Sequence, residues 1–218
     1  MKQTTWIAPS ILSADFADMG RDVRRMEQAG ADLIHCDVMD GLFVPNISFG
    51  FKMIEDIKRH TRLPLDVHLM IEKPERYLER FIKAGADYLT FHFEAATRPE
   101  QALRDVRGAG VKAGLVISPD TPPEVLPPFL PLCDMLLVMS VYPGFGGQSY
   151  IPGAADKLAF LRRAIDEGGY DCRLEVDGGI AEQTVGAAKA AGADTLVAGS
   201  AVFAARDAGA AIEMLRRA

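Results

Sequence analysis

The stretch Ala29-Gly30-Ala31-Asp32 decides the fold, because it recurs along the chain. It returns as Ala84-Gly85-Ala86-Asp87 and as Ala191-Gly192-Ala193-Asp194, and a weaker copy is Ala109-Gly110-Val111-Lys112. Each copy follows an amphipathic, helix-like segment and precedes a hydrophobic run that favours a strand. Glycine just past a helix end commonly adopts the left-handed conformation that stops the helix. The motif therefore indicates the end of a helix followed by a strand.

The spacing of the motif predicts how many such units the chain holds. Its glycines are separated by 55, 25 and 82 residues, which fit two, one and three units of roughly 27 residues. A chain of 218 residues then holds about eight units. Eight strand–helix units predict an α/β fold, a (β/α)8 TIM barrel, as a single domain over residues 1–218.

Eight hydrophobic runs supply the expected strands. They are rich in Val, Ile, Leu and aromatic residues without strict alternation, which is typical of parallel strands buried on both faces. The expected strands are 6–10, 33–38, 65–69, 88–91, 113–117, 135–139, 173–176 and 195–198. Hydrophobic stripes and N-terminal prolines indicate helices between them. The exception is 122–131, where five prolines leave room for a turn or two at most.

The composition limits the kind of protein. Hydrophobic residues make up 49% of the chain and charged residues 25%, and the net charge is −6. This balance argues against binding to nucleic acid, which requires a basic patch. No hydrophobic run is long enough to span a membrane. The three cysteines, Cys36, Cys133 and Cys172, lie in or beside hydrophobic runs. We expect them to be free thiols in a reducing compartment, and the protein to be cytoplasmic.

The candidate chemistry lies at the carboxyl ends of the strands, where barrels of this kind carry their active sites. His35 and Asp37 are two residues apart and so share one strand face. They are either a hydrogen-bonded structural pair or two ligands of a divalent metal. His68 and Asp177 stand at the ends of two other strands, and four buried groups of this kind need a shared partner. We expect the four to hold one divalent ion: Zn²⁺, Fe²⁺, Mn²⁺ or Co²⁺. His92, at the end of strand four, is expected either to support the metal ligands from behind or to be structural.

Glycines cluster after three consecutive strands, where they either make tight turns or cradle a phosphate with their backbone N–H groups. We favour the phosphate. The clusters are Gly144, Gly146 and Gly147, then Gly178 and Gly179, then Gly199 with Ser200. Met39, Met70 and Met139 each stand just beyond a strand. Methionine there is more often core filler, but around a metal site it would offer a dry, polarisable rim.

These groups suit proton transfer on a sugar phosphate. Asp37 and Asp177 come from strands two and seven, on roughly opposite sides of the ring. One carboxylate can remove a proton from one face of the substrate, and the other can return one to the opposite face. The metal would stabilise the enediolate formed between the two transfers. The predicted reaction is an epimerisation without a redox cofactor. None of the eight lysines faces the pocket from a strand end, which disfavours a Schiff-base mechanism.

Five motifs form a specific set: Ala8 to Asp15, Asp37 to Gly41 with Phe43 to Asn46, Asp66 to Met70, Pro143 to Gln148, and Glu175 to Ile180. Together they resemble the ribulose-phosphate 3-epimerase family over essentially the whole chain. The resemblance implies a barrel of the ribulose-phosphate-binding type. It also implies that the chain interconverts D-ribulose 5-phosphate and D-xylulose 5-phosphate in the pentose phosphate pathway. The same four metal ligands are implied, with Asp37 and Asp177 as the acid/base pair.

The resemblance further implies the residues that contact substrate. These are Ser10, His68, Gly144, Phe145, Gly146, Gly147, Asp177, Gly178, Gly179, Gly199 and Ser200. Barrels of this kind often associate through helix faces, so we expect a homo-oligomer. Leu42 and Tyr142 depart from the family pattern, which often has His and Asn there, and this puts the shape of their loops in doubt.

Three other functions remain open. A D-allulose 6-phosphate 3-epimerase would use the same site with a longer pocket. A lyase on a related barrel would carry a D-x-K-x-x-D pattern on strand three, but Asp66-Val67-His68-Leu69-Met70-Ile71 lacks the lysine and the second aspartate. A non-catalytic barrel that senses sugar phosphates would have no reason to hold two carboxylates on a metal.

Overall fold

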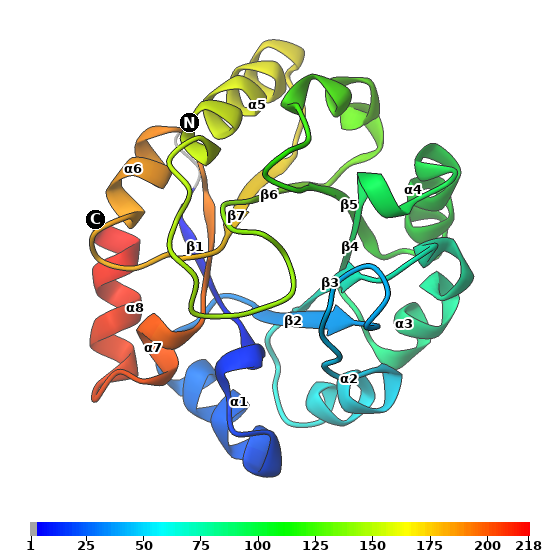
Figure 1. The fold of residues 1–218 in the computed structure, drawn as a ribbon. Helices are drawn as coiled ribbons and strands as arrows, with labels where there is room; N and C mark the ends of the chain where they lie inside the picture. The colour runs from blue at the N-terminus through cyan, green and yellow to red at the C-terminus, as the bar shows by residue number, and fades with distance from the viewer. Residues whose placement is uncertain (1–3) are drawn as a thin grey trace.

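Eight parallel strands form the centre of the structure, a computed structural model that describes residues 4–218. In Figure 1 the strands ring a common axis and the helices surround them. The strands are β1 (Trp6–Pro9), β2 (Ile34–Met39), β3 (Leu65–Met70), β4 (Tyr88–His92), β5 (Lys112–Ile117), β6 (Met135–Met139), β7 (Arg173–Asp177) and β8 (Thr195–Ala198). Neighbours pair in the order β1-β8-β7-β6-β5-β4-β3-β2. A parallel bridge between Ser10 and His35 joins β1 to β2.

The predicted (β/α)8 barrel is therefore confirmed, and each strand end lies within one residue of its expected position. Three methionines predicted to stand just beyond a strand are instead the last residues of β2, β3 and β6: Met39, Met70 and Met139. The first three residues of the predicted domain, 1–218, lie outside the described part of the chain.

The helices differ in length from one unit to the next. The α-helices are α1 (Met19–Gln28), α2 (Phe51–Lys58), α3 (Leu78–Ala84), α4 (Pro99–Gly108), α5 (Ala154–Gly168), α6 (Val185–Ala190), α7 (Ser200–Phe203) and α8 (Ala208–Arg217). Short 3₁₀ turns are η1 (Ile11–Ser13), η2 (Phe16–Asp18), η3 (Pro74–Arg76), η4 (Phe93–Ala95), η5 (Pro123–Val125) and η6 (Pro127–Leu132). Only η5 and η6 connect β5 to β6, as the prolines there predicted.

The repeated motif acts at the amino-terminal end of the barrel. Its glycines, at positions 30, 85, 110 and 192, all have φ between 80° and 107°, the left-handed region expected of a helix stop. The aspartate that follows the glycine forms a reciprocal pair with the first residues of an adjacent strand. Its N–H donates to a backbone carbonyl, and its carboxylate accepts from the N–H of the same residue. The pairs are Asp32 with Ile7, Asp87 with Leu65 and Asp194 with Leu174. Asp134 does not belong to a copy of the motif, but it pairs with Ala113 in the same way.

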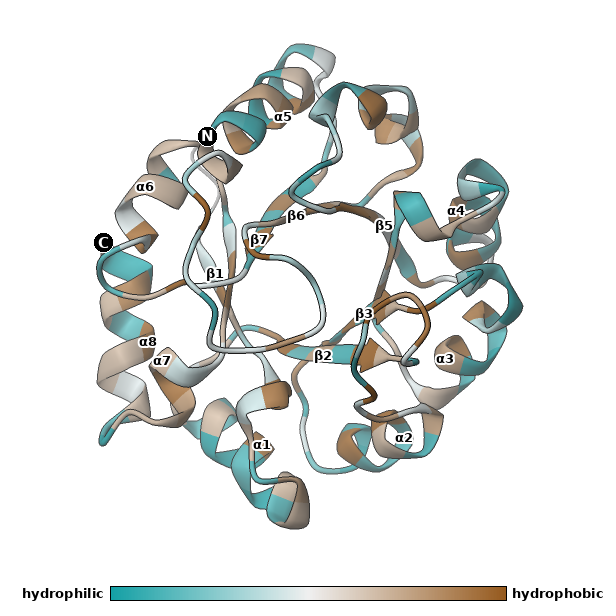
Figure 2. Ribbon diagram, viewed as in Figure 1, coloured by the Kyte–Doolittle hydropathy of each residue, from teal (hydrophilic) through white to brown (hydrophobic). Residues whose placement is uncertain are grey.

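The hydrophobic core lies between the strands and the helices. Figure 2 shows hydrophobic residues concentrated on the strands and hydrophilic ones on the outer parts of the helices. The strand β2 is an exception, because hydrophilic residues interrupt it inside the barrel. They include His35 and Asp37, which are 0% and 3% exposed. Among residues 4–218, no helix is long and apolar enough to cross a membrane.

Candidate active site

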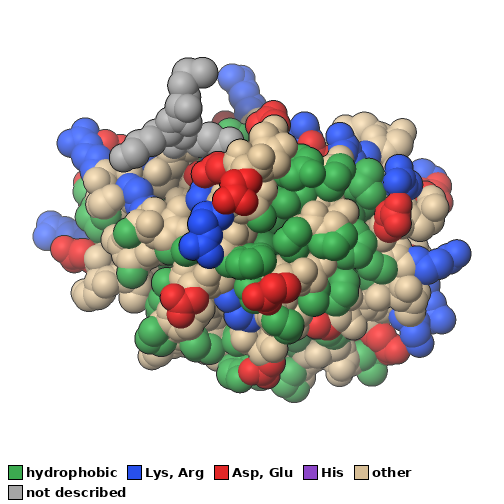
Figure 3. Space-filling model, turned by 90° about the horizontal axis from the view of Figure 1, so that it is seen from above, with side chains coloured by type: hydrophobic (Ala, Val, Ile, Leu, Met, Phe, Trp, Pro, Cys, Tyr) green, Lys and Arg blue, Asp and Glu red, His purple; other side chains and the backbone are tan. Residues whose placement is uncertain are grey.

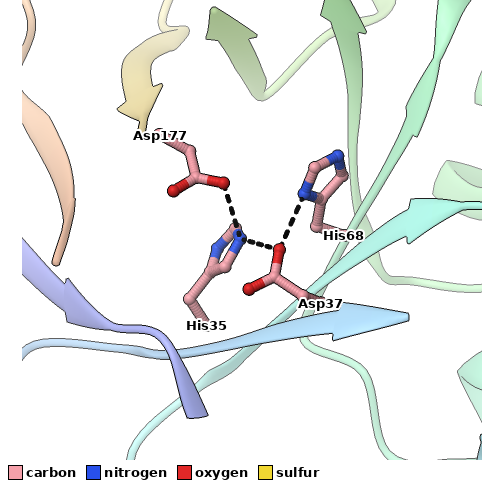
Figure 4. Close-up of side chains that lie close together, drawn as sticks. All are labelled: His35, Asp37, His68 and Asp177. Atoms are coloured by element: carbon pink, nitrogen blue, oxygen red, sulfur yellow. Dashed lines mark hydrogen bonds and ion pairs between the residues drawn. The ribbon is translucent and has the colours of Figure 1, made fainter. Parts of the chain in front are cut away.

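Strand pairing brings together the four residues expected to bind a metal. Asp37 of β2 lies opposite His68 of β3 in the parallel register. The Oδ1 atom of Asp37 lies 3.2 Å from His68 Nδ1 and 3.2 Å from His35 Nε2. Asp177, the last residue of β7, places Oδ2 4.0 Å from His35 Nε2. Figure 4 shows these side chains pointing toward one another.

This geometry fits a divalent cation. One ligand atom from each of the four residues lies within 4.8 Å of the others. Two ligands about 2.1 Å from one ion lie ~3.0–3.4 Å apart, which matches the two contacts of Asp37. The Nε2 atom of His35 is buried and has no hydrogen-bond partner. A buried polar atom without a partner costs free energy, and a cation would satisfy it. The set of two imidazoles and two carboxylates suits a transition metal.

Two further acidic residues stand behind His35. Its Nδ1 atom lies 2.5 Å from Asp66 Oδ2, which fixes the ring so that Nε2 faces the site. Glu175 Oε1 lies 3.8 Å from the same nitrogen, and both Glu175 oxygens lack a hydrogen-bond partner. Neither residue was predicted from the sequence to have a role in the site. The available signal was spacing, because Asp66 and Glu175 stand two positions before His68 and Asp177, on the same strand faces.

The carboxyl groups of the site differ in their pKa. Burial would raise the pKa of Asp37, but the neighbouring His35 and His68 rings outweigh it and hold that pKa well below its usual range. Burial and the neighbouring Asp37 charge raise the pKa of Asp177 to about 7. Burial also lowers the pKa of His68 to about 4, which favours the neutral ring that a metal requires.

The site opens into a cavity of about 190 Å³ at the carboxyl end of the barrel. Of the residues expected to contact substrate, all but His68 line it: Ser10, Gly144, Phe145, Gly146, Gly147, Asp177, Gly178, Gly179, Gly199 and Ser200. His68 is fully buried behind Asp37. The Ser10 hydroxyl donates to Asp37 Oδ2 at 2.5 Å. Met39, Met70 and Met139 also line the cavity, together with Asp37 and Asp177.

The loops over this cavity are held by polar contacts that the sequence analysis did not identify. Asn46 Nδ2 donates to Gly144 O at 2.7 Å, which links the loop after β2 to the loop after β6. Gln148 Nε2 donates to Tyr142 O and Phe145 O and so shapes the glycine loop from within. Leu42 and Tyr142, where the chain departs from the family pattern, are 75% and 53% exposed. Neither lines the cavity.

The glycines after β7 permit a close approach of two backbone segments. Gly179 has φ +62°, and a Cβ there would lie 2.5 Å from Tyr150 N. A side chain at position 179 is therefore excluded both by the backbone of Tyr150 and by the left-handed conformation of Gly179 itself. Gly178 and Gly179 both line the cavity, so the chain passes this part of the wall without a side chain.

Comparisons with known proteins identify the family of the chain. Residues 6–203 match the profile described as the ribulose-phosphate 3 epimerase family. The chain is 49% identical to the ribulose-phosphate 3-epimerase of Synechocystis sp., over 93% of this chain and 89% of that protein. It is 47% identical to the enzyme of that name from Bacillus subtilis (96% and 97% covered) and 48% identical to that from Escherichia coli K12 (90% and 88% covered).

Solved structures support the fold alone, because their sequence identity is low. KGPDC from Streptococcus mutans superimposes with a TM-score of 0.73 at 13% identity, covering 99% of this chain and 97% of that one. The 3-hexulose-6-phosphate synthase of Salmonella typhimurium gives 0.70 at 19% identity, with 97% of both chains covered. The family profile and the curated relatives decide the assignment: the chain belongs to the ribulose-phosphate 3-epimerase family, whose members are isomerases.

Proposed function

We propose that the chain interconverts D-ribulose 5-phosphate and D-xylulose 5-phosphate by two-base proton transfer at C3, as a step of the pentose phosphate pathway. One observation carries this proposal. Asp37 and Asp177 reach the same cavity from β2 and β7, and no cationic side chain is among the residues that line it. Two carboxylates on different walls of one cavity can address opposite faces of a bound ketose.

The phosphate binds at the glycine loops after β6, β7 and β8. Backbone N–H groups supply the hydrogen bonds, which explains how a chain with net charge −6 can hold an anionic substrate. The loops after strands seven and eight are the usual phosphate site of this fold. With the phosphate there, C2 and C3 of the sugar reach toward Asp37 and Asp177.

The residues of the site then have different roles in the reaction. One carboxylate accepts the C3 proton, and the other donates a proton to the opposite face of the same carbon. Ser10 holds Asp37 in place through its hydroxyl. The three methionines exclude water from the reacting carbon without offering a competing base. One divalent ion (Zn²⁺, Fe²⁺, Mn²⁺ or Co²⁺), held by His35, Asp37, His68 and Asp177, would supply electrostatic stabilisation of the enediolate oxygens.

The test is an assay of the purified protein in deuterated water. Epimerisation of D-ribulose 5-phosphate should be accompanied by solvent deuterium at C3 of the product. Activity should disappear with a chelator and return when a divalent metal is added. A higher kcat/KM for D-allulose 6-phosphate would instead assign the hexulose phosphate as substrate. The comparisons do not favour that alternative, because the curated relatives carry the ribulose-phosphate name.

The surroundings of the reaction are also proposals. We infer a cytoplasmic location, because all three cysteines are buried free thiols. We infer a homo-oligomer from the wall of the barrel seen in Figure 3, where hydrophobic side chains cover much of the visible surface. The elements η6 and α5 carry partly buried hydrophobic residues, among them Phe129, Leu132 and Phe160. Sedimentation of the purified protein as a monomer at micromolar concentration would contradict the second inference.

A further inference from the structure

A chain of three side chains leads away from the metal-binding residues toward the protein surface. The Nε2 atom of His68, on β3, lies 3.1 Å from the Nε2 atom of His92, on β4. The two rings stack with centroids 5.1 Å apart and planes inclined by 29°. His92 Nδ1 lies 3.2 Å from Glu94 Oε2. Both histidines are fully buried, so no solvent replaces these contacts.

Glu94, the acceptor at the outer end of these three side chains, determines the direction in which their hydrogen bonds are donated. A carboxylate only accepts hydrogen bonds, so the hydrogen of a neutral His92 ring belongs on Nδ1, facing Glu94. The Nε2 atom of His92 is then an acceptor. The neighbouring Nε2 of His68 must therefore carry a hydrogen and donate it. A neutral ring has one N–H, so His68 Nδ1 is left with a free lone pair.

That free lone pair points into the site. His68 Nδ1 is the atom 3.2 Å from Asp37 Oδ1, within the cluster able to hold a cation. A metal binds an imidazole nitrogen that carries no hydrogen, and the other ring nitrogen normally donates to a fixed partner. For His35 that partner is Asp66. For His68 it is another histidine, whose own orientation is decided by Glu94.

The hydrogen bonds of the two histidines can also run in the opposite direction, because other atoms can then accept and donate. Asp37 can accept from His68 Nδ1–H, and Ser118 Oγ, 3.3 Å from His92 Nδ1, can donate to that nitrogen. This arrangement would block the metal ligand. It would also leave the Glu94 carboxylate facing a nitrogen lone pair, which is repulsive. The first direction leaves Asp37 Oδ1 facing the His68 Nδ1 lone pair instead, but Asp37 also has the Ser10 hydroxyl and His35 Nε2 beside it. Among residues 4–218 the only partner of Glu94 Oε2 is His92, so Glu94 favours the first direction.

Glu94 is well held as a carboxylate. Its Oε1 accepts from Ser118 N–H at 2.8 Å and from the Thr121 hydroxyl. Burial would raise the pKa of Glu94, but these bonds and His92 lower it to about 2. Lys157 of α5 donates to the carbonyls of Ser118, Pro119 and Thr121, and so holds this segment over Glu94.

We propose that His92 and Glu94 are positioning residues that keep His68 in the tautomer with a free Nδ1, ready to bind metal. This inference rests on the proposed metal dependence and adds to it two residues that do not touch the substrate cavity. Phe43 packs on the His92 ring with centroids 4.7 Å apart, so the ring is fixed from its other side.

Three substitutions and one control test the proposal by Zn²⁺ affinity, measured in competition with a chromophoric chelator. Glu94→Gln and His92→Leu should each weaken binding about 10–100-fold. His92→Gln should stay close to wild type, because its amide oxygen can accept from His68 Nε2–H. Thr90→Val is the matched control on the same strand. The Thr90 hydroxyl is buried without a partner, and its removal should leave Zn²⁺ affinity unchanged.

The second readout is the tautomer of His68 itself, from nitrogen–proton NMR correlations of ¹⁵N-histidine protein without metal. Wild type, His92→Gln and Thr90→Val should carry the His68 hydrogen on Nε2. Glu94→Gln and His92→Leu should move it wholly or partly to Nδ1. A merely structural role for Glu94 or His92 would lower stability without moving this hydrogen.

The outcomes are distinguishable. Wild-type affinity and tautomer in both Glu94→Gln and His92→Leu would overturn the positioning role while leaving the metal proposal intact. Weaker binding with an unchanged tautomer would also overturn it. Failure of the wild-type protein to bind Zn²⁺, Mn²⁺, Fe²⁺ or Co²⁺ would overturn both proposals together.

Discussion

At the amino-terminal end of the barrel the acidic groups are paired, whereas around His35, inside the barrel, several buried polar atoms have no partner. Each of the four amino-terminal aspartates bonds to strand backbone and to a cation: Asp32 to Arg216, Asp87 to Lys58, Asp134 to Lys112 and Asp194 to Arg173. Around His35, the buried atoms without a partner are His35 Nε2, Asp66 Oδ1 and both oxygens of Glu175.

This difference in pairing indicates which polar groups contribute mainly to stability and which contribute mainly to function. Polar groups that satisfy one another stabilise the fold and leave nothing for a ligand. Groups buried without partners are costly, and they are retained where something else completes them. The comparison therefore predicts that changes at the amino-terminal end lower stability, and that changes at the other end lower activity. Five experiments test this prediction.

The largest expected effect is that of Asp177→Asn at the carboxyl-terminal end. The amide cannot exchange a proton with C3 and is a poorer metal ligand, so kcat should fall about a thousandfold or more. The free energy of unfolding of the metal-free protein should be close to wild type, since a buried carboxylate is removed. Turnover within tenfold of wild type (~1.4 kcal/mol) would contradict the two-base proposal.

Asp194→Ala is the counterpart at the amino-terminal end. Asp194 accepts from Leu174 N–H, and its ion pair with Arg173 is 3.1 Å long. Burial outweighs the two neighbouring arginines and raises the pKa of Asp194, so the pair adds little net stability when intact. Breaking it strands buried donors and should lower the free energy of unfolding by about 3 kcal/mol in urea titrations. The kcat of the folded variant should be unchanged; a large loss of kcat would break the comparison.

Glu94 predicts a pH dependence of stability at the carboxyl-terminal end. Its pKa is lowered from 4.5 to about 2 in the fold. A lowered pKa stabilises the folded state above the unfolded value, and this contribution is lost as the pH falls from about 4.5 to about 2. The loss should be on the order of 2 kcal/mol. Urea titrations across this range should show a shallower decline for Glu94→Gln; parallel curves would exclude the assignment.

Gly179→Ala should act on substrate binding. The added Cβ would lie 2.5 Å from Tyr150 N and 2.9 Å from Gln148 O, so the backbone of the loops that line the cavity must move. We expect KM for D-ribulose 5-phosphate to rise about tenfold, or ~1.4 kcal/mol, with a smaller change in kcat. Gly153→Ala, where nothing lies within 4 Å of the added Cβ, is the matched control. An unchanged KM would argue that the phosphate binds elsewhere.

Asp87→Asn should have the smallest effect. Asp87 forms the same kind of reciprocal pair as Asp194, in this case with Leu65. Its side chain is 39% exposed, and the side chain of its ion-pair partner Lys58 is 35% exposed. The amide oxygen can still accept from Leu65 N–H, and exposed ion pairs contribute little. A loss below about 1 kcal/mol is expected. A loss as large as that of Asp194→Ala would mean that burial is not what separates the two aspartates.

Much of the fold and of the site could be predicted from the sequence because the deciding signals are local. The glycine that stops a helix and the hydrophobic run that forms a strand are read within one unit, and their repetition gives eight units. Side chains alternate between the two faces of a strand, so His35 and Asp37 share one face. Barrels of this kind carry their active sites at the carboxyl ends of the strands, so the strand ends are expected to meet at one pocket. The roles of the individual site residues stay predictions until they are measured.

The sequence alone determined the barrel, the eight strands and the group of His35, Asp37, His68 and Asp177. Only the tertiary structure decided which partner each of these groups meets. Asp66 reaches His35 because β2 and β3 pair in one particular register. Glu94 reaches His68 through His92 because β4 lies beside β3. The motif aspartates bond to strands about 20 to 25 residues away. Such contacts depend on strand register and ring closure, which no single stretch of sequence specifies.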